Sequence, residues 1–334
     1  MRAVVLVGGF GTRLRPLTST IPKQMLPIVD RPMIECVLSS LAQHGVDDAI
    51  LSLGYRPDAF IAAYPDDLCA GVRLHYAVES EPLDTAGAVR FAAQEGGVDS
   101  TFLVVNGDVL TDLDVTALWD VHRDRGAEGT IALTPVEEPS RYGVVPTDER
   151  GRVEAFIEKP PPDEATSKWI NAGTYVLEPS VLERIPSGRK VSIERETFPA
   201  MVDEGSLFAV QSDAYWVDAG TPATYLEAQL DLIDGVRGTV VRAISSTADV
   251  NPEAFVEHSV VMDGASVGAN ARVSDSTLLP GAVVEAGALV DRSIVGPRAV
   301  VGAGARLDGL TVVGADTRVE AGTQWHDARI PTEG

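Results

Sequence analysis

Aliphatic residues recur every six positions through the last third of the sequence, and this period is the strongest constraint on the fold. The series consists of Val261, Val267, Val273, Leu279, Val284, Val290, Val295, Val301, Leu307, Val313 and Val319, with five-residue steps after Leu279 and Val290. Six residues make one short strand and one corner of a parallel β-helix, whereas the strands of a β-sandwich would alternate with period two. The repeat therefore predicts a parallel β-helix over residues 250–325, preceded by a linker at 235–250.

The preceding 1–235 segment has a different pattern, in which short apolar strands alternate with amphipathic helices. We expect strands at 2–7, 48–53, 72–78 and 101–105, with helices after Asp30-Arg-Pro32, at 57–64 and at 85–93. Strands then dominate at 129–136, 142–146, 153–158 and 170–177, before helices near 194–203 and 222–234. The alternation through residue 105 predicts an α/β domain in which helices cover both faces of an open parallel sheet. Ligands of such sheets bind beyond the carboxyl ends of the strands.

A glycine-rich loop, Gly8-Gly-Phe-Gly-Thr-Arg13, follows the first strand. Glycines allow backbone N–H groups to close on phosphate oxygens. The loop lacks the Gly-Lys-Ser/Thr of a P-loop, and Leu14 stands where a dinucleotide fingerprint requires glycine. Residues 1–29 contain no acid, although the whole chain has a net charge of −22. Arg13 and Lys23 beside this loop therefore indicate a site for a polyphosphate.

The composition excludes several kinds of partner. With 49 acidic against 27 basic residues, the chain is expected to bind neither nucleic acid nor an anionic membrane surface. Cys36 and Cys69 form no CxxC pair, which favours reduced thiols in a cytoplasmic protein. The histidines show neither triad nor zinc spacing and are expected to be structural: His44, His75, His122, His258 and His326.

The segment GGFGTRLRPLT, with Pro22-Lys23 four residues further on, resembles the sugar-1-phosphate nucleotidyltransferases. This resemblance covers nearly the whole chain, because many members also carry a C-terminal left-handed β-helix. It implies a Rossmann-like open mixed sheet as the nucleotidyltransferase domain. It also implies that Gly8, Gly9, Gly11 and Thr12 wrap a nucleoside triphosphate. Arg13 and Lys23 would be the catalytic cations on the reacting phosphates.

Two aspartates match the metal-binding positions of the resembled family. Asp108 ends the motif Asn106-Gly-Asp108, and Asp218 lies in Tyr215-Trp-Val-Asp-Ala-Gly-Thr221. The resemblance implies that both carboxylates ligate one Mg²⁺, which takes oxygen ligands and shares them with phosphates and water. The alternative is that Asp108 caps a turn and Asp218 pairs with an arginine.

Three segments are similar to those that hold the sugar phosphate in the family. In Glu158-Lys159-Pro160, the resemblance assigns Glu158 to sugar hydroxyls and Lys159 to the phosphate. Asn171 and Gly173 lie in the sugar loop, and Gly143 would present its backbone to the sugar. The alternatives are a surface salt bridge for Lys159 and a turn cap for Asn171.

The base of the nucleotide would be read by the segment Glu81-Pro-Leu-Asp-Thr-Ala-Gly87. The resemblance assigns nucleotide contacts to Glu81, Pro82, Thr85 and Gly87. Many relatives have glycine where this chain has Asp84. If that position requires a positive φ, aspartate tolerates it better than most residues do.

The implied reaction is attack of a sugar 1-phosphate on the α-phosphorus of a nucleoside triphosphate, with release of pyrophosphate. The segments Val136–Val145 and Ser192–Pro199 are most similar to mannose-1-phosphate guanylyltransferases, which favours GTP and mannose 1-phosphate. Thymidylyl, uridylyl or adenylyl transfer to glucose 1-phosphate remains an alternative, as does guanylyl transfer to a heptose or cyclitol phosphate.

Two further classes of protein remain as alternatives. One is a non-catalytic regulatory subunit of the same fold, and the other is a hexapeptide acyltransferase. The flat faces and open ends of a β-helix also predict a homo-oligomer, a dimer or larger, that forms through this part of the chain.

Overall fold

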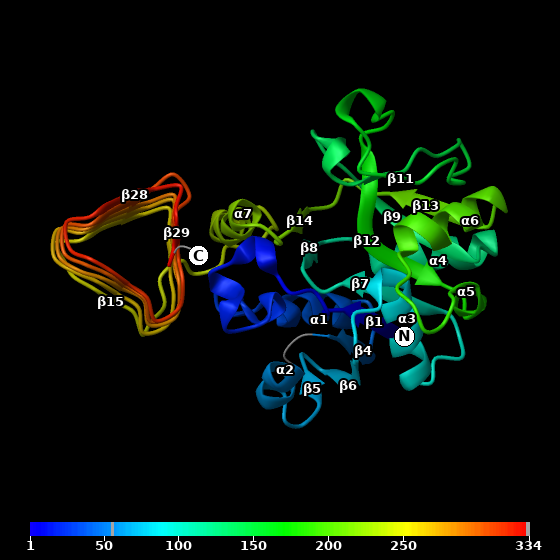
Figure 1. The fold of residues 1–334 in the computed structure, drawn as a ribbon, viewed down its shortest axis with the longest axis horizontal. Coiled ribbons are helices and arrows are strands. Elements are labelled where there is room, and N and C mark those ends of the chain that lie inside the picture. The colour runs from blue at the N-terminus through cyan, green and yellow to red at the C-terminus, as the bar shows by residue number, and fades with distance from the viewer. Residues whose placement is uncertain (55–56, 332–334) are drawn as a thin grey trace. The chain divides into compact units, whose positions relative to one another are not determined.

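The computed structural model describes residues 1–54 and 57–331, and it divides into two compact units (Figure 1). The first unit comprises Met1–Gly9 and Val37–Trp216. The second comprises Phe10–Cys36 and the chain from Val217 onward. Neither unit is continuous in sequence, because the segment after the first strand belongs to the same unit as the C-terminal repeats.

The first unit is built on a ten-stranded mixed sheet. Its central strands, in spatial order, are β7 (Phe102–Asn106), β1 (Arg2–Leu6), β4 (Asp48–Leu53) and β6 (Val72–Val78). These strands all pair in parallel. The observation confirms the predicted open α/β sheet. It also places the carboxyl ends of β1, β4, β6 and β7 along one edge.

Antiparallel pairing enters the sheet with the long strand β12 (Trp169–Leu177), which pairs with both β7 and β9 (Gly129–Pro135). The remaining strands of this unit are β5 (Leu68–Cys69), β8 (Val109–Thr111), β10 (Gly143–Val144), β11 (Ile157–Glu158) and β13 (Leu207–Gln211), and β14 (Trp216–Asp218) begins at its end. The strand predicted over 153–158 was too long. Val153 makes only an isolated bridge to Thr147, and regular pairing begins at Ile157.

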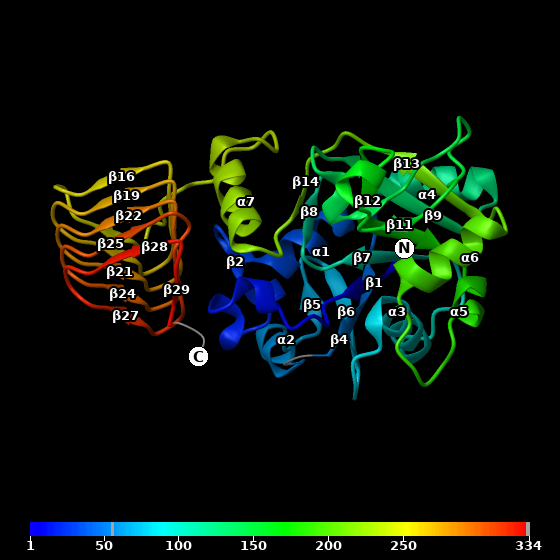
Figure 2. The same ribbon diagram turned by 45° about the horizontal axis from the view of Figure 1, so that its top comes forward.

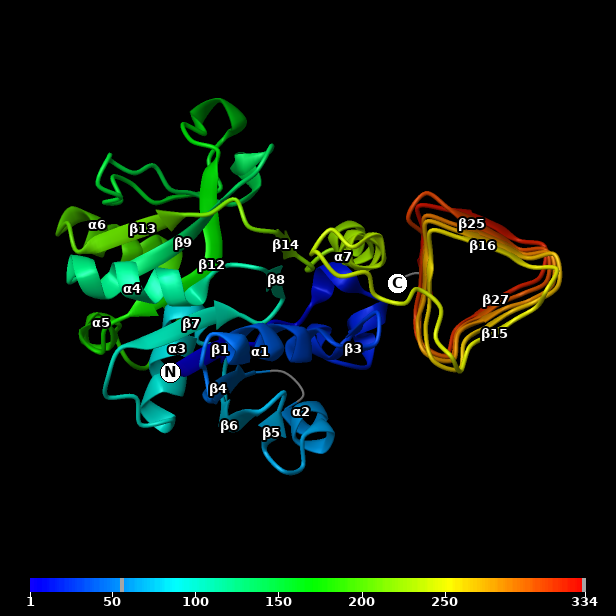
Figure 3. The same cartoon turned by 180° about the vertical axis from the view of Figure 1, so that it is seen from behind.

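Helices cover both faces of this sheet, as Figure 3 shows from behind. They are α2 (Pro57–Ala63), α3 (Asp84–Glu95), α4 (Val115–Arg125), α5 (Ser180–Arg184) and α6 (Phe198–Asp203), with a π-helical turn at Ile193–Thr197. Helices α3, α5 and α6 bury apolar residues against one face. On the other face, His122 of α4 is hydrogen-bonded to Thr130 of β9 at 2.9 Å. Within residues 1–54 and 57–331, none of the helices is both long and apolar enough to cross a membrane.

The second unit begins with three 3₁₀ turns, Thr12–Leu14, Leu17–Ser19 and Lys23–Met25, and the short hairpin β2 (Pro27–Ile28) and β3 (Arg31–Pro32). Helix α1 (Met33–Gln43) starts there, and α7 (Pro222–Asp234) returns to it. Gln229 of α7 is fully buried; its amide donates to the Pro27 carbonyl at 2.8 Å and accepts from the Val29 N–H at 2.7 Å. This one side chain thus satisfies two backbone groups of a segment some 200 positions away.

The C-terminal repeats form three parallel sheets of five strands each, the arrangement of a left-handed β-helix (Figures 1 and 2). The first sheet contains β15 (Asp249–Val250), β18 (Ser266–Val267), β21 (Val283–Val284), β24 (Val300–Val301) and β27 (Arg318–Val319). The second contains β16 (Phe255–Glu257), β19 (Arg272–Ser274), β22 (Leu289–Asp291), β25 (Arg306–Asp308) and β28 (Gln324–His326). The third contains β17 (Val260–Val261), β20 (Thr277–Leu278), β23 (Ile294–Val295), β26 (Val312–Val313) and β29 (Arg329–Ile330).

Ten of the eleven predicted inward positions lie in the buried core of the β-helix, and one was wrong by a single residue. Leu278, not Leu279, pairs with Val261 and Val295 and points into the core. Neighbouring residues of a strand face opposite sides, so two adjacent leucines left the register open. The five-residue step therefore falls before Leu278. The same core also takes Ile244, earlier in the chain than the predicted repeat.

One outer face of the β-helix is covered within its own unit. Outward residues of the third sheet, Thr277, Ile294 and Val312, are fully buried, although they do not point into the core. At the corner beside this sheet, His258 lies between Asp275, at 2.5 Å, and Asp234 of α7, at 3.0 Å. The hydrogen bonds that His258 donates to Asp275 and to Asp234 raise the pKa of its imidazole, which favours the charged imidazolium between the two carboxylates.

We expect Val284→Ala to lower the free energy of unfolding by about 2 kcal/mol, because it removes two methyl groups from the core and leaves a cavity. Val283 is the matched control, since it precedes Val284 on the same strand and points outward. Val283→Ala should cost less than about 1 kcal/mol. Urea unfolding of the two variants measures the difference in the free energy of unfolding. Equal losses would contradict the assignment of Val284 to the inner face and Val283 to the outer face.

Candidate active site

Loops at the carboxyl edge of the parallel strands form the first part of the site. Gly8 follows β1 and lies beside Gly54 and Glu79, which follow β4 and β6; a β-carbon on Gly8 would be 3.5 Å from the Gly54 nitrogen. Gly107 after β7 approaches the end of β1, since its N–H donates to the Leu6 carbonyl at 3.0 Å. Four strand ends therefore meet here, as the topology requires.

Asp108 owes its position to the glycine before it. A β-carbon on Gly107 would lie 2.6 Å from a methyl of Val7, so a larger residue would push the loop away from β1. With glycine there, Asp108 follows directly after this contact and is only 9% exposed. The fold thus brings Asp108 next to the chain that leads into Gly8 and Gly9.

Glu79 is a buried carboxylate at this edge that the sequence motifs did not single out. One oxygen accepts from the Ser52 hydroxyl at 2.9 Å, and the other accepts from the Leu83 N–H at 3.0 Å. Glu79 therefore ties the end of β4 to the loop that precedes α3. An acid directly after a predicted strand, two residues before Glu81, was the available sequence signal.

The segment Glu81–Gly87 runs into α3, with Glu81 and Pro82 exposed. Asp84 has a φ of 61°, a backbone conformation that glycine adopts more readily than other residues, and its carboxylate accepts from the Thr85 N–H at 2.9 Å. Gly87 is buried, and a β-carbon there would lie 2.8 Å from the side chain of Leu83. The glycine is thus required by packing inside the protein.

The sugar-loop residues lie on an irregular stretch of β12, where the pairing with β9 shifts between Asn171 and Tyr175. Asn171 accepts from the Gly173 N–H at 2.9 Å and donates to the buried Tyr175 hydroxyl at 2.8 Å. Gly173 has a φ of 74° and faces Asn106 at the end of β7. Asn171 therefore does cap a local turn, as one alternative predicted, and this turn adjoins the sheet edge that carries Asp108.

Gly143 and Glu158 are paired neighbours on β10 and β11. A β-carbon on Gly143 would lie 2.8 Å from Phe156 and 3.1 Å from a carboxylate oxygen of Glu158. The ammonium of Lys159 is 3.1 Å from the Glu158 carboxylate, and its side chain is 61% exposed. Because the ammonium end of this pair is exposed to solvent, Lys159 can reorient toward a phosphate at small cost.

The remaining predicted residues belong to the second unit. Gly11, with a φ of 62°, lies against Thr18 and Lys23, and its carbonyl accepts from the Thr18 hydroxyl at 2.7 Å. Arg13 and Asp218 approach to 4.0 Å. Thr12 and Arg13 are both exposed.

Gly220 explains how Arg13 and Asp218 share this space. The Gly220 N–H donates to the Asp218 carboxylate at 2.9 Å. A β-carbon on Gly220 would lie 2.7 Å from that carboxylate and 2.8 Å from the Arg13 guanidinium. The glycine thus allows an arginine and an aspartate to lie side by side.

The structure therefore brings the predicted residues together in two sets. The first unit holds Gly8, Gly9, Glu81, Pro82, Thr85, Gly87, Asp108, Gly143, Glu158, Lys159, Asn171 and Gly173; the second holds Gly11, Thr12, Arg13, Lys23 and Asp218. Joint binding of one metal ion by Asp108 and Asp218 remains a prediction. Among residues 1–54 and 57–331, no three histidines, cysteines or acids gather as metal ligands. The carboxylates of Asp108 and Asp218 are the kind of donors that suit a hard cation. Such a cation takes one or two carboxylates and completes its coordination shell with phosphate oxygens and water.

Two family models match the chain. The nucleotidyl transferase model matches residues 2–235, and the model of the GMPPB C-terminal domain matches residues 238–331. A solved structure, HddC from Yersinia pseudotuberculosis complexed with GMP-PN, is similar with a TM-score of 0.59 and 32% identity. This similarity covers 68% of the present chain and 97% of HddC.

Curated relatives show the same likeness, and one of them shows it over a longer stretch. A mannose-1-phosphate guanylyltransferase of Mycobacterium tuberculosis is 40% identical over 279 residues, which are 80% of this chain and 76% of the relative. A mannose-1-phosphate guanyltransferase of Aspergillus fumigatus is 46% identical over 232 residues, 68% of this chain and 62% of the relative.

The turn beside Asn106 yields a prediction with a built-in control. Gly173→Ala would place a β-carbon 2.5 Å from the Asn106 amide at a φ of 74°, whereas Gly188, at a φ of 75°, has nothing within 4 Å. Gly188→Ala should cost about 1 kcal/mol from its backbone conformation alone. Gly173→Ala should cost about 2–4 kcal/mol, because overpacking is added. Equal losses in chemical unfolding would show that the packing against Asn106 is loose.

Proposed function

The chain belongs to the nucleotidyl transferase family, and on this premise we propose that it transfers a guanylyl group from GTP to mannose 1-phosphate, forming GDP-mannose and pyrophosphate. The observation that carries the proposal is the 40% identity with a mannose-1-phosphate guanylyltransferase over 80% of the chain, a span that must include repeat residues as well as the first 235. The complex of HddC with GMP-PN supports a guanine nucleotide.

The reaction needs positioning and positive charge more than acid–base catalysis. An oxygen of the sugar 1-phosphate, already an anion, attacks the α-phosphorus and forms a new P–O bond, while the bond to the β-phosphate oxygen breaks. Repulsion between the anions is the main barrier, and preorganised cations lower it. Arg13 and Lys23 would neutralise the triphosphate and the leaving pyrophosphate. Lys159 would orient the attacking phosphate, for which its exposed, weakly held ammonium is suited.

Enzymes of this kind generally use a divalent metal ion, and we infer that Mg²⁺ is used here. Asp108 and Asp218 would hold it, and when bound it would share positive charge among the phosphate oxygens. Arg13 lies 4.0 Å from Asp218, so the guanidinium would also orient that carboxylate.

The other predicted residues would select the substrates. Gly8, Gly9, Gly11 and Thr12 would wrap the phosphates through their backbone. Glu81, Pro82, Thr85 and Gly87 would form the base-reading loop, Glu81–Gly87. On the sugar side, Glu158 would accept hydrogen bonds from sugar hydroxyls and Asn171 would bond a ring hydroxyl, with Gly143 and Gly173 keeping the backbone close. We expect these small-molecule reactants, and no nucleic acid or membrane, in a cytoplasmic protein.

The test is pyrophosphate release with Mg²⁺, crossing GTP, dTTP, UTP, ATP and CTP with the 1-phosphates of mannose, glucose, galactose and N-acetylglucosamine. GTP with mannose 1-phosphate should dominate. Another dominant pair would change the specificity but keep the mechanism. No release from any pair would contradict GDP-mannose synthesis. It would point either to a sugar phosphate outside the grid, such as a heptose or cyclitol phosphate, or to the non-catalytic regulatory subunit.

Asp108→Asn tests the metal role in the same assay. It should abolish turnover, because a neutral amide binds Mg²⁺ far more weakly than a carboxylate does, while the melting temperature stays nearly unchanged. Asp99→Asn is the control, since Asp99 is an exposed carboxylate in a loop of the same unit. A large loss of melting temperature in Asp108→Asn alone would identify Asp108 as structural.

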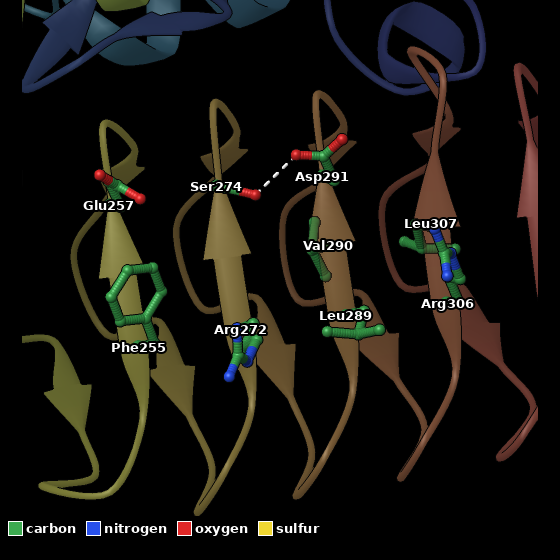
Figure 4. Close-up of a pocket in the computed structure, with 9 residues that line it drawn as sticks. All are labelled: Phe255, Glu257, Arg272, Ser274, Leu289, Val290, Asp291, Arg306 and Leu307. Carbon is green, nitrogen blue, oxygen red and sulfur yellow. Dashed lines mark hydrogen bonds between the residues drawn. The ribbon is translucent and has the colours of Figure 1, made fainter.

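We also propose that the chain forms a homo-oligomer through the β-helix. The second sheet presents an exposed face with two rows of side chains around a pocket of about 300 Å³ (Figure 4). Arg272 and Arg306 lie in one row with Phe255, and the acids Glu257 and Asp291 lie in the other. This mixture of charge lowers the repulsion that a second copy of a −22 chain would meet.

Light scattering at micromolar concentration should therefore give at least the mass of a dimer. Arg306→Glu should shift the chain toward the monomer, because it makes this face more acidic. A monomeric mass for the wild-type chain would contradict the oligomer, and an unchanged mass for the variant would place the interface elsewhere.

A further inference from the structure

A segment far along the chain is hydrogen-bonded to the base-reading loop. The Val191 carbonyl accepts from the N–H groups of Ala86, at 2.9 Å, and Gly87, at 3.2 Å. In return, the Val191 N–H donates to the Leu83 carbonyl at 3.0 Å. The segment that follows β12 and α5 thus runs alongside the loop that starts α3.

These contacts supply what the start of α3 lacks. The residue before the helix is Leu83, which offers no side-chain cap, so the first N–H groups of α3 need partners from elsewhere. The next residue, Asp84, is held at a φ of 61°, a conformation that costs an L-residue about 1–2 kcal/mol. Such a loop keeps its shape only where its surroundings hold it.

Thr85 is the side chain through which the distant segment holds the loop. Its hydroxyl donates to the Glu194 carboxylate at 2.7 Å and accepts from the Ile193 N–H at 2.8 Å. The Ser192 hydroxyl donates to the same Glu194 oxygen at 2.7 Å. A threonine hydroxyl has one proton to donate. The Thr85 hydroxyl donates this proton to Glu194, so it cannot donate a hydrogen bond to a nucleotide.

We propose that Glu194 is a positioning residue for base recognition, acting through Thr85 to hold the base-reading loop in the shape that favours guanine. The inference rests on the assignment of that loop under the proposed function. Glu194 acts as a hydrogen-bond acceptor for two hydroxyls, so its charge is not what the loop requires. Glutamine should retain the function of Glu194, because its carbonyl oxygen can accept the same two hydrogen bonds. Alanine should lose it, because its side chain has no acceptor.

Glu196 provides a matched control on the same turn. Its carboxylate is 2.6 Å from the guanidinium of Arg189 at the surface, and it makes no hydrogen bond to Thr85 among those seen in the described residues. Glu196→Ala removes one acid from this turn, as Glu194→Ala does, but it leaves the hydrogen bonds of Thr85 to Glu194 and Ile193 in place.

The experiment compares Glu194→Ala, Glu194→Gln and Glu196→Ala with the wild type. Titration calorimetry measures the Kd of GTP and of ATP, and the pyrophosphate assay measures kcat and each KM. Glu194→Ala should weaken GTP binding about tenfold, the effect of losing one hydrogen bond in a buried network. Its preference for GTP over ATP should fall, with kcat within about twofold and the KM for mannose 1-phosphate unchanged. Glu194→Gln and Glu196→Ala should behave as the wild type.

Two results would overturn the proposal. Unchanged GTP affinity and preference in Glu194→Ala, with only a lower melting temperature, would make Glu194 purely structural. Equal impairment of Glu194→Gln and Glu194→Ala would show that the charge matters. If Glu194→Ala does not fold, Thr85→Val tests the same contact, and Thr85→Ser should restore it.

The binding measurement separates this inference from the proposed function. If the wild type binds GTP but releases no pyrophosphate with any sugar phosphate, the proposed reaction fails, and the Glu194 variants still decide the role in binding. If the wild type binds no nucleotide, the loop does not read a base, and the inference fails with it.

Discussion

The parallel pairing of β1 with β4 and β7 is the constraint on which the rest of the site depends. Parallel strands end at the same edge. With β6 added beside β4, this pairing brings Gly8, Glu79 and Asp108 together from three parts of the sequence. The backbone then needs close approaches at this edge, and Gly8 and Gly107 permit them. A glycine loop placed anywhere else in the chain would be an ordinary turn. Here it opens beside the buried carboxylate of Glu79 and close to Asp108, the proposed metal ligand.

Much of the site is held by contacts inside the protein, which leaves few side chains free for ligands. Asn171 uses its amide group on Gly173 and Tyr175, and the Thr85 hydroxyl is used by Glu194 and Ile193. Apart from any bond to a ligand, such groups fix the backbone and the loops around them. The exposed cations are different, because Arg13 and Lys159 sit in weak, solvent-accessible ion pairs that can yield to phosphate. Rigid loops that carry reorientable cations suit a reaction whose main barrier is the repulsion between two anionic reactants.

The β-helix obeys a separate rule, since each coil must place an aliphatic side chain on every inner face. Coils of this chain are 17 or 18 residues long because some steps between inward residues are five instead of six. The third sheet also buries its outer face, where Thr277 and Ile294 are inaccessible to solvent. One sheet therefore carries two apolar surfaces, and this explains why Leu278 and Leu279 are both aliphatic although only Leu278 faces the core.

The α/β sheet, the β-helix and the family could all be predicted from the amino-acid sequence, because each rests on periodicity or on one continuous motif. The period of six, the buried strand before Gly8 and the cations Arg13 and Lys23 can all be read along the chain. The side chains that meet across long separations became known only from the folded chain. The contact of Thr85 with Glu194 spans 109 positions, and the bond from Val29 to Gln229 spans 200. No local pattern encodes such pairs, since they depend on how separate elements pack once the sheet and helices have formed.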